Sequence, residues 1–210
     1  MVEDVAGTDV EMVQTTNYPW EGKVAIAVNP TTSKSFTLRV RVPNRDVSAL
    51  YTAKPEVHGM TSIAVNGQVV KPAVVNGYAE IQRTWKAGDT VVLELPLGVQ
   101  RMYASEKVAA DRGRVALRYG PLVYNIEKVD QDIEAVLDPA SPLTTEWRGD
   151  LLGGVTVIRG RFANGAPMLA IPNFARFNRQ PPAPPPPRPE PGAPPTPPPA
   201  PSSIVWIREI

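Results

Sequence analysis

The amino-acid sequence predicts an all-β protein, an antiparallel β-sandwich organised as two small sandwiches in tandem. Over most of the chain before residue 180, apolar side chains alternate with polar ones at period two. Turn signals separate the alternating segments, and no window long enough for a helix shows a 3.6-residue period. Short strands joined by regularly spaced turns are typical of antiparallel sandwiches.

The alternation is clearest at residues 36–42, where four large apolar side chains alternate with Thr37, Arg39 and Arg41. A half-buried strand needs this pattern, because successive side chains point to opposite faces of a sheet. Weaker alternation predicts further strands at residues 24–28, 63–65, 68–70, 77–83, 91–95, 115–119, 122–126, 155–158, 167–171 and 203–207.

The turns between these segments support the strands. Asn66 and Gly67 separate two short apolar runs and predict a hairpin with a type I′ turn. Asn76 and Gly77 open the next strand, and residues 86–89 close it. Residues 104–110 have room for one helical turn at most.

A change in pattern near residues 102–107 suggests a domain boundary. We expect a first sandwich at residues 1–104 and a second at 105–210, although one continuous sandwich with a waist fits the periodicity equally well. Residues 181–201 hold 14 of the 25 prolines. This proline-rich insertion favours polyproline II. We interpret it as a solvated loop, in preference to a ligand for an SH3-type or WW-type groove.

Composition excludes several classes of function. The net charge of +1 gives no electrostatic basis for binding nucleic acid or an anionic membrane. No apolar run is long enough to span a bilayer. The chain has no cysteine and one histidine, His58, so we expect no cofactor and no metal. The acidic start shows no signal peptide, which makes a cytoplasmic location the default expectation.

No catalytic motif is visible. The serine-hydrolase elbow, the phosphate-binding loop and the zinc-protease helix are all missing. Glu80 and Glu94 fall on predicted strands but on the faces opposite the apolar rows. A general acid needs a buried or crowded carboxyl group, so these two do not form a catalytic pair. Asp130 and Asp132 are interpreted as a solvated turn in preference to a calcium site.

Aromatic residues are the remaining candidates for a site. Trp85 and Trp206 fall on predicted strands and are expected in the core. Asn17, Tyr18 and Trp20 lie on a turn just before a strand. They are the candidate residues for an interface or for stacking on a sugar, since exposed aromatic rings serve both purposes.

Several segments resemble the C-terminal β-sandwich region of glycoside hydrolase family 127, the β-L-arabinofuranosidase-like family. The most specific are residues 16–24, which contain Tyr18, Pro19 and Trp20, and residues 111–124, which run from Asp111 to Tyr124. Residues 62–67, 77–78, 83–89, 170–175 and 178–179 are similar to the same region.

The resemblance implies an accessory region. The family's full-length enzymes are described as an (α/α)6 barrel followed by sandwich domains, with a cysteine nucleophile, a glutamate acid/base and a zinc bound in the barrel. None of those residues has a counterpart here, so no catalytic residue is carried over. The implied partners are a catalytic barrel, as a domain or a subunit, or a second copy in a homodimer.

Three hypotheses follow. The first is a non-catalytic accessory region that braces the barrel or mediates dimerisation, from a truncated gene product or a separate subunit. The second is a stand-alone carbohydrate-binding module for plant-type, arabinose-containing glycans. The third, a complete hydrolase with an unrecognised carboxylate pair, is disfavoured because the chain lacks both cysteine and a helical domain.

Overall fold

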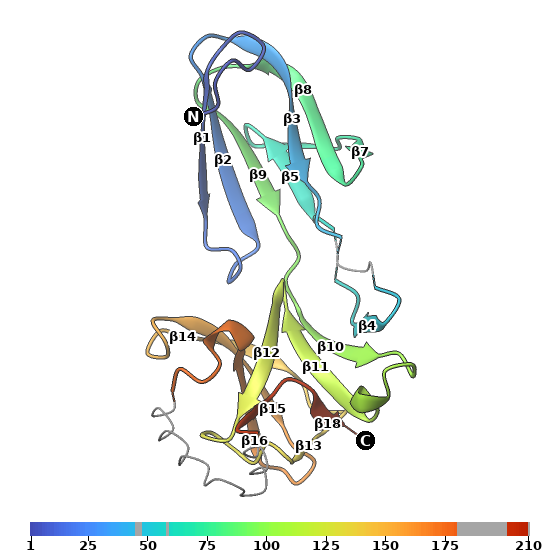
Figure 1. Ribbon diagram of the computed structural model, residues 1–210. Coiled ribbons are helices and arrows are strands. Elements are labelled where there is room, and N and C mark those ends of the chain that lie inside the picture. Colours follow the sequence, from blue (N-terminus) through green and yellow to red (C-terminus); the bar gives the residue numbers. More distant parts are fainter. Residues whose placement is uncertain (45–47, 58, 180–200, 210) are drawn as a thin grey trace, which may run out of the picture. The chain divides into compact units, whose positions relative to one another are not determined.

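The computed structural model describes residues 1–44, 48–57, 59–179 and 201–209 (Figure 1). His58 and the proline-rich insertion, apart from Pro201, lie outside the described residues. The regular structure of the described residues is nearly all β-strand, and their two helical segments are single 3-10 turns, η1 (Ala109–Asp111) and η2 (Asn173–Ala175). Among these residues, no helix has the length and hydrophobicity needed to cross a membrane. The predicted all-β, antiparallel fold is therefore confirmed.

The chain divides into two compact units. Unit 1 comprises Met1–Gln100 and Tyr119–Pro121, and unit 2 comprises Arg101–Arg118 and Leu122–Ile210. The division of the sequence into residues 1–104 and 105–210 stays a proposal about domains, because compactness alone does not show that either unit folds by itself.

Unit 1 contains two antiparallel sheets. The larger sheet has the order β1-β2-β9-β5-β6, formed by Val10–Thr16, Lys23–Pro30, Asp89–Glu94, Ser62–Val65 and Gln68–Val70. The smaller sheet has the order β3-β8-β7, formed by Lys34–Arg41, Tyr78–Trp85 and Val74–Val75. A further short strand is β4 (Tyr51–Lys54).

The core of unit 1 contains apolar side chains from both sheets. It includes Val28 and Val91 from the larger sheet and Val40, Ile81 and Trp85 from the smaller one. Trp85 is fully buried, stacks on the ring of Phe36 with centroids 5.9 Å apart, and donates its indole N–H to the Phe36 carbonyl at 3.0 Å. The expected core role of Trp85 is confirmed.

The predicted Asn66–Gly67 hairpin is also confirmed. Both residues have positive φ, at 51° and 79°, as a type I′ turn requires. The Asn66 side chain donates to Asp89 Oδ1 at 2.8 Å and accepts the Thr90 N–H at 2.8 Å. Asp89 Oδ2 accepts the Lys86 N–H at 2.9 Å, so one carboxylate links two turns.

Unit 2 is built on one continuous sheet with the order β13-β18-β11-β12-β16-β15-β14. These strands are Val136–Leu137, Ile207–Glu209, Arg114–Tyr119, Leu122–Glu127, Pro167–Pro172, Val155–Arg161 and Thr144–Arg148. In addition, β10 (Val99–Ala104) pairs with β11, and β17 (Ser203–Ile204) pairs with β12. Four consecutive residues of β15, residues 155–158, are buried. Both faces of this strand are therefore covered.

The last predicted strand, residues 203–207, is not continuous. It consists of β17 on β12 and β18 on β11, with a bend at residues 205–206 where the chain changes partner. Trp206 lies in this bend and is half-buried, so its expected place in the core is wrong. Arg114 donates to the Trp206 carbonyl at 3.1 Å, which satisfies a backbone group that the interrupted ladder leaves unpaired.

Candidate functional site

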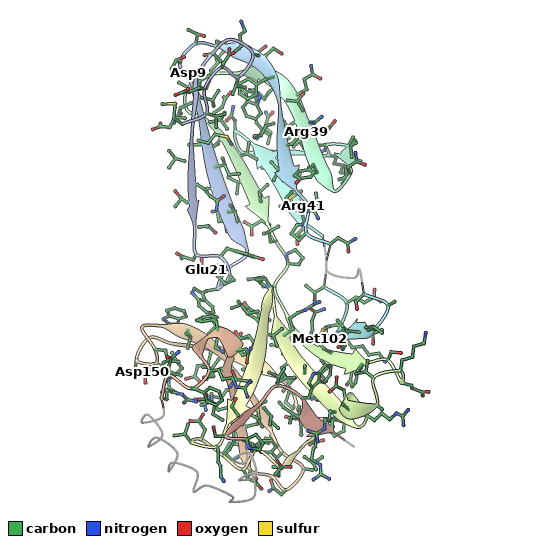
Figure 2. The ribbon with its side chains drawn as sticks, viewed as in Figure 1. Asp9, Glu21, Arg39, Arg41, Met102 and Asp150 are labelled. Atoms are coloured by element: carbon green, nitrogen blue, oxygen red, sulfur yellow. The ribbon has the colours of Figure 1, made fainter. Side chains whose placement is uncertain are left out.

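The candidate residues Asn17, Tyr18 and Trp20 lie on the loop between β1 and β2. The N–H groups of Trp20 and Glu21 both donate to the Asn17 carbonyl, at 2.8 and 3.2 Å. Thr16 closes the base of the loop, because its hydroxyl accepts the Tyr18 N–H at 2.9 Å and donates to the Lys23 carbonyl at 2.7 Å. The loop is therefore a hydrogen-bonded turn, with Glu21 near its tip (Figure 2).

The three candidate residues differ in exposure. Asn17 is exposed, Trp20 is half-buried, and Tyr18 packs against the core of unit 1. The structure brings them together on one turn, but it gives Tyr18 a packing role. Asn17 offers the most surface to an interface or to a sugar, while Tyr18 and Trp20 are both half-buried.

Tyr119 supports this loop from a distant part of the sequence. Its hydroxyl donates to the Trp20 carbonyl at 3.4 Å. Burial raises the pKa of Tyr119, and the nearby negative charge of Glu21 raises it further. Gly120 follows with φ of 56°, and a Cβ there would lie 2.8 Å from Leu97 Cδ2. The positive φ favours glycine at this position, a constraint that strand periodicity cannot indicate.

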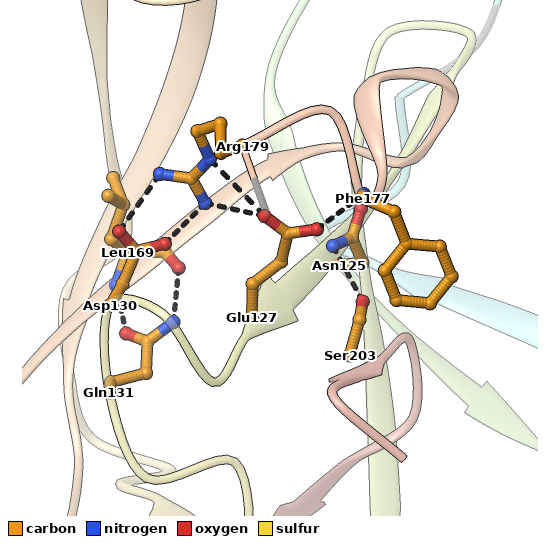
Figure 3. A network of polar contacts seen from close by, with 8 residues as sticks. All are labelled: Asn125, Glu127, Asp130, Gln131, Leu169, Phe177, Arg179 and Ser203. Carbon is orange, nitrogen blue, oxygen red and sulfur yellow. Dashed lines mark hydrogen bonds and ion pairs between the residues drawn. The ribbon is translucent and has the colours of Figure 1, made fainter. Parts of the chain in front are cut away.

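A buried ionic network ties together the C-terminal part of unit 2 (Figure 3). The Glu127 side chain is completely buried at the end of β12. Arg179 donates to Glu127 Oε2 at 2.8 Å and to Asp130 Oδ1 at 2.9 Å. The Phe177 N–H donates to Glu127 Oε1 at 2.7 Å, so both oxygens of the buried carboxylate are hydrogen-bonded.

Neighbouring amides extend the network to other strands (Figure 3). Asn125 donates to the Ser203 hydroxyl at 2.9 Å, and Gln131 makes two 2.7 Å hydrogen bonds with the Leu169 backbone. Asp130 lies in an exposed turn, as expected, and its carboxylate also accepts a hydrogen bond from Arg179 in this cluster. In the sequence, Asn178 and Arg179 are noted only because they resemble a family segment. Nothing near them in the sequence shows that Arg179 pairs with Glu127 and Asp130.

Unit 2 also contains an open polar hollow of about 590 Å³, lined in part by Tyr103, Arg112, Arg114 and Glu209. Three carboxylates line it, those of Glu106, Asp111 and Glu209, and Glu209 forms an ion pair with Arg101. Burial raises the pKa of Tyr103, and a hydrogen bond to Glu209 raises it further. Arg101 also donates to the carbonyls of Asp138 and Ser141, at 3.2 and 3.0 Å, so it is a structural clamp.

Hydrogen bonds to positive groups hold the exposed acids of β14 and its loop in the ionised form. Arg148 donates two hydrogen bonds to Asp150, at 2.8 and 2.7 Å, and lowers the pKa of Asp150 to about 2. Arg159 lowers the pKa of Glu146 in the same way. Burial alone would raise the pKa of Asp89, but its hydrogen bonds to Asn66 and Lys86 and the charge of Arg83 outweigh burial and lower it.

Comparison with known proteins places this tandem β-sandwich chain among glycoside hydrolases. Residues 2–97 match the model of the β-L-arabinofuranosidase GH127 middle domain, and residues 99–183 match that of the glycoside hydrolase family 127 C-terminal domain. The chain belongs to glycoside hydrolase family 127 and contains the family's middle and C-terminal domains.

Individual relatives agree with this assignment. The chain is 29% identical over 167 residues to a non-reducing end β-L-arabinofuranosidase of Bifidobacterium longum subsp. longum, covering 74% of this chain and 23% of the relative. It is similar to the crystal structure of a GH127 β-L-arabinofuranosidase from Geobacillus stearothermophilus T6, with a TM-score of 0.75, 29% identity and coverage of 97% of this chain and 31% of that one.

A third comparison supports the fold alone. A solved GH127 β-arabinofuranosidase has a TM-score of 0.78 at 24% identity, with coverage of 97% of this chain and 32% of that chain. The 210 residues thus span between a quarter and a third of the length of these relatives.

Proposed function

We propose that this chain is the non-catalytic accessory β-sandwich region of a β-L-arabinofuranosidase-like glycoside hydrolase, and that it braces the catalytic (α/α)6 barrel. The alternative accessory role is dimerisation, and the sedimentation experiment described below tests it. The match to the middle and C-terminal domains of the family supports the accessory assignment. The state of the acidic side chains carries the non-catalytic part of the proposal.

Hydrolysis of a glycosidic bond commonly requires a carboxyl group that keeps its proton near neutral pH, so its pKa must be raised. Among the described residues, every carboxyl pKa whose shift is resolved is lowered: Asp89, Glu146 and Asp150. The most deeply buried acid, Glu127, forms an ion pair with Arg179 and accepts a hydrogen bond from the Phe177 N–H. These groups are suited to holding structure together and unsuited to donating a proton.

An assay of the purified chain with an aryl β-L-arabinofuranoside tests the non-catalytic assignment. We expect release of the aryl group at the rate of the buffer control. Turnover that a single substitution such as Glu209→Gln abolishes would overturn the proposal and favour a complete hydrolase. Glu209 is the appropriate target because its carboxylate lines the polar hollow of unit 2.

A second candidate function, binding to arabinose-containing glycans, is favoured by one exposed aromatic residue. Trp147 on β14 is 56% exposed. A Cβ on Gly154 would lie 2.7 Å from Trp147 Cζ2, so the indole ring rests against the backbone of Gly154. A ring supported in this way is a suitable platform for a sugar face.

Affinity electrophoresis in gels that contain arabinan tests this second candidate. A binding module would be retarded by the polysaccharide, and Trp147→Ala would restore free migration. An accessory region without glycan affinity would migrate equally in gels with and without arabinan. The Trp20→Ala variant, measured in parallel, tests the residue that the sequence pointed to.

A further inference from the structure

Two neighbouring rows on the outward face of the larger sheet of unit 1 contain no charged side chain. In the register of the strands, one row of side chains runs through Thr15, Ala25, Val92, Ala64 and Val69. A second row contains Val13, Ala27 and Thr90. We call these eight residues the outer patch. Figure 1 shows β1, β2, β9 and β5, which carry seven of them, side by side.

The outer patch points away from the core. Along β2, β9 and β5 its residues alternate with core residues such as Val24, Val28 and Val91, and successive strand residues point to opposite faces. Val13 and Val69, at the two edges, are 47% and 70% exposed. Because three of the eight residues are alanine, the centre of the patch is flat and open to close approach.

The other sheet of the same unit provides an internal comparison. Its outward face carries Ser35, Thr37 and Arg39 on β3, opposite Thr84, Gln82 and Glu80 on β8. Arg39 donates to Glu80 at 2.8 Å, and both Arg39 and Arg41 are exposed. This face has the polar composition expected of an antiparallel sheet in water. The outer patch departs from that expectation within the same unit.

Polar rows border the outer patch along the strands. Lys23 and Glu94 are paired at one end of the two rows. At the other end, Asn29 donates to Glu11 at 3.1 Å. An apolar, uncharged centre within a polar rim is the usual anatomy of a protein–protein interface.

We propose that the outer patch is the docking surface for the catalytic barrel that precedes the middle domain in family 127 enzymes. This inference rests on the proposed function, because it names the surface through which the bracing acts. A barrel of this kind would present helices, and large aliphatic side chains on a helix fill the shallow surface that Ala25, Ala27 and Ala64 leave.

Two observations favour the barrel over a second copy of this chain. The matched relatives are three to four times longer than the matched region, and the first matched part is a middle domain. In addition, the middle-domain match begins at residue 2, and Val2 pairs with Val10 at the start of β1. A domain preceding residue 2 therefore joins the chain at the edge of the sheet that carries the outer patch.

The test measures binding of the chain to the barrel encoded in the same gene or in the neighbouring reading frame, produced as a separate polypeptide. The test variant is Ala64→Arg, which places a charge at the centre of the outer patch. The control is Gln82→Arg, an identical charge on the polar outward face of β8. Val69→Lys, at an exposed edge position, is a second test variant in case Ala64→Arg disturbs the sheet, and circular dichroism checks the fold of all three.

We expect the wild-type chain and Gln82→Arg to bind the barrel with affinities within about twofold of each other. Ala64→Arg should weaken binding by about 100-fold, because a buried unpaired charge is strongly unfavourable at an interface. If Ala64→Arg and Val69→Lys both bound the barrel as tightly as the wild-type chain, the outer patch would be overturned as the docking surface. The bracing function would remain intact. No binding by the wild-type chain would overturn the bracing function, and the docking inference with it.

Sedimentation velocity of the chain alone tests whether a second copy of the chain, and not the barrel, covers the outer patch. A concentration-dependent dimer that Ala64→Arg abolishes and Gln82→Arg retains would assign the outer patch to a second copy, and would overturn the barrel as its partner.

Discussion

At the scale of single residues, Trp85 is a central side chain of the core of unit 1. It is fully buried, stacks on Phe36 and donates its indole N–H to the Phe36 carbonyl at 3.0 Å. We expect Trp85→Ala to lower the free energy of unfolding by about 3–5 kcal/mol, because it leaves a large cavity among packed side chains. Urea unfolding followed by circular dichroism measures this change.

Trp85→Phe is the matched control, since it keeps most of the ring volume and removes the N–H donor. Its loss should be clearly smaller, about 1–2 kcal/mol, mainly from the Phe36 carbonyl that loses its partner. A loss below about 1 kcal/mol for Trp85→Ala would contradict the core role.

Arg179 is the second residue whose removal should be costly. It neutralises Glu127, whose side chain is 0% exposed. We expect Arg179→Ala to destabilise the protein by about 3–5 kcal/mol, because the buried carboxylate loses its counter-charge. Arg179→Lys keeps the charge but loses the planar fork, so its effect should be intermediate.

Arg148→Ala provides a control for the Arg179 variants. Arg148 also forms a close ion pair, at 2.7 Å with Asp150, but the Asp150 side chain is 68% exposed. Exposed pairs contribute little to stability because water screens them. A thermal unfolding experiment should leave Arg148→Ala close to the wild type, and similar losses for the two alanine variants would show that burial is not the deciding factor.

At the scale of elements, the two ends of the proline-rich insertion meet at the same point of β12. Before it, Arg179 binds Glu127. After it, Ser203 is the strand partner of Glu127, and the Lys128 N–H donates to the Ser202 carbonyl at 2.8 Å. A long connection is therefore not needed to reach β17.

We predict that replacing residues 181–201 with a short Gly-Ser linker leaves the protein folded. Shortening the connection reduces its closure entropy by on the order of 1 kcal/mol, so the melting temperature should hold or rise. Circular dichroism and thermal unfolding measure both effects. If the shortened protein failed to fold, our interpretation of the insertion as a solvated loop would be wrong.

At the scale of the whole molecule, the core of unit 1 is complete within the first 100 residues. Its buried members run from Val10 to Leu93. We predict that a fragment of residues 1–104 folds alone, with dispersed amide resonances and cooperative urea unfolding. Its stability should be lower than in the intact chain, because it lacks Tyr119, whose hydroxyl donates to the Trp20 carbonyl.

The Trp85→Ala variant of the same fragment is the control for this test. Trp85→Ala should collapse the dispersion of the isolated fragment, since a small domain has little stability in reserve. A wild-type fragment with the narrow amide dispersion of an unfolded chain would show that the two units depend on each other.

The sequence anticipated local features well and the candidate site only in part. The Asn66–Gly67 turn and the burial of Trp85 follow from short-range preferences, and both are present. The loop with Asn17 and Trp20 was identified, but the packing of Tyr18 against the core was not. The first strand, β1, has only one fully buried residue, Val10, so alternation gave too weak a signal to predict it.

The sequence by itself determined the all-β class, most strands and the family, because side-chain alternation, turn chemistry and short motifs are properties of neighbouring residues. Only the tertiary structure decided that Arg179 meets Glu127, 52 residues away, and that residues 203–209 change partner from β12 to β11. It also decided that uncharged side chains gather in the outer patch of the larger sheet of unit 1, since that grouping depends on strand order and register. Pairing between distant strands is a collective result of packing, and no local pattern specifies it.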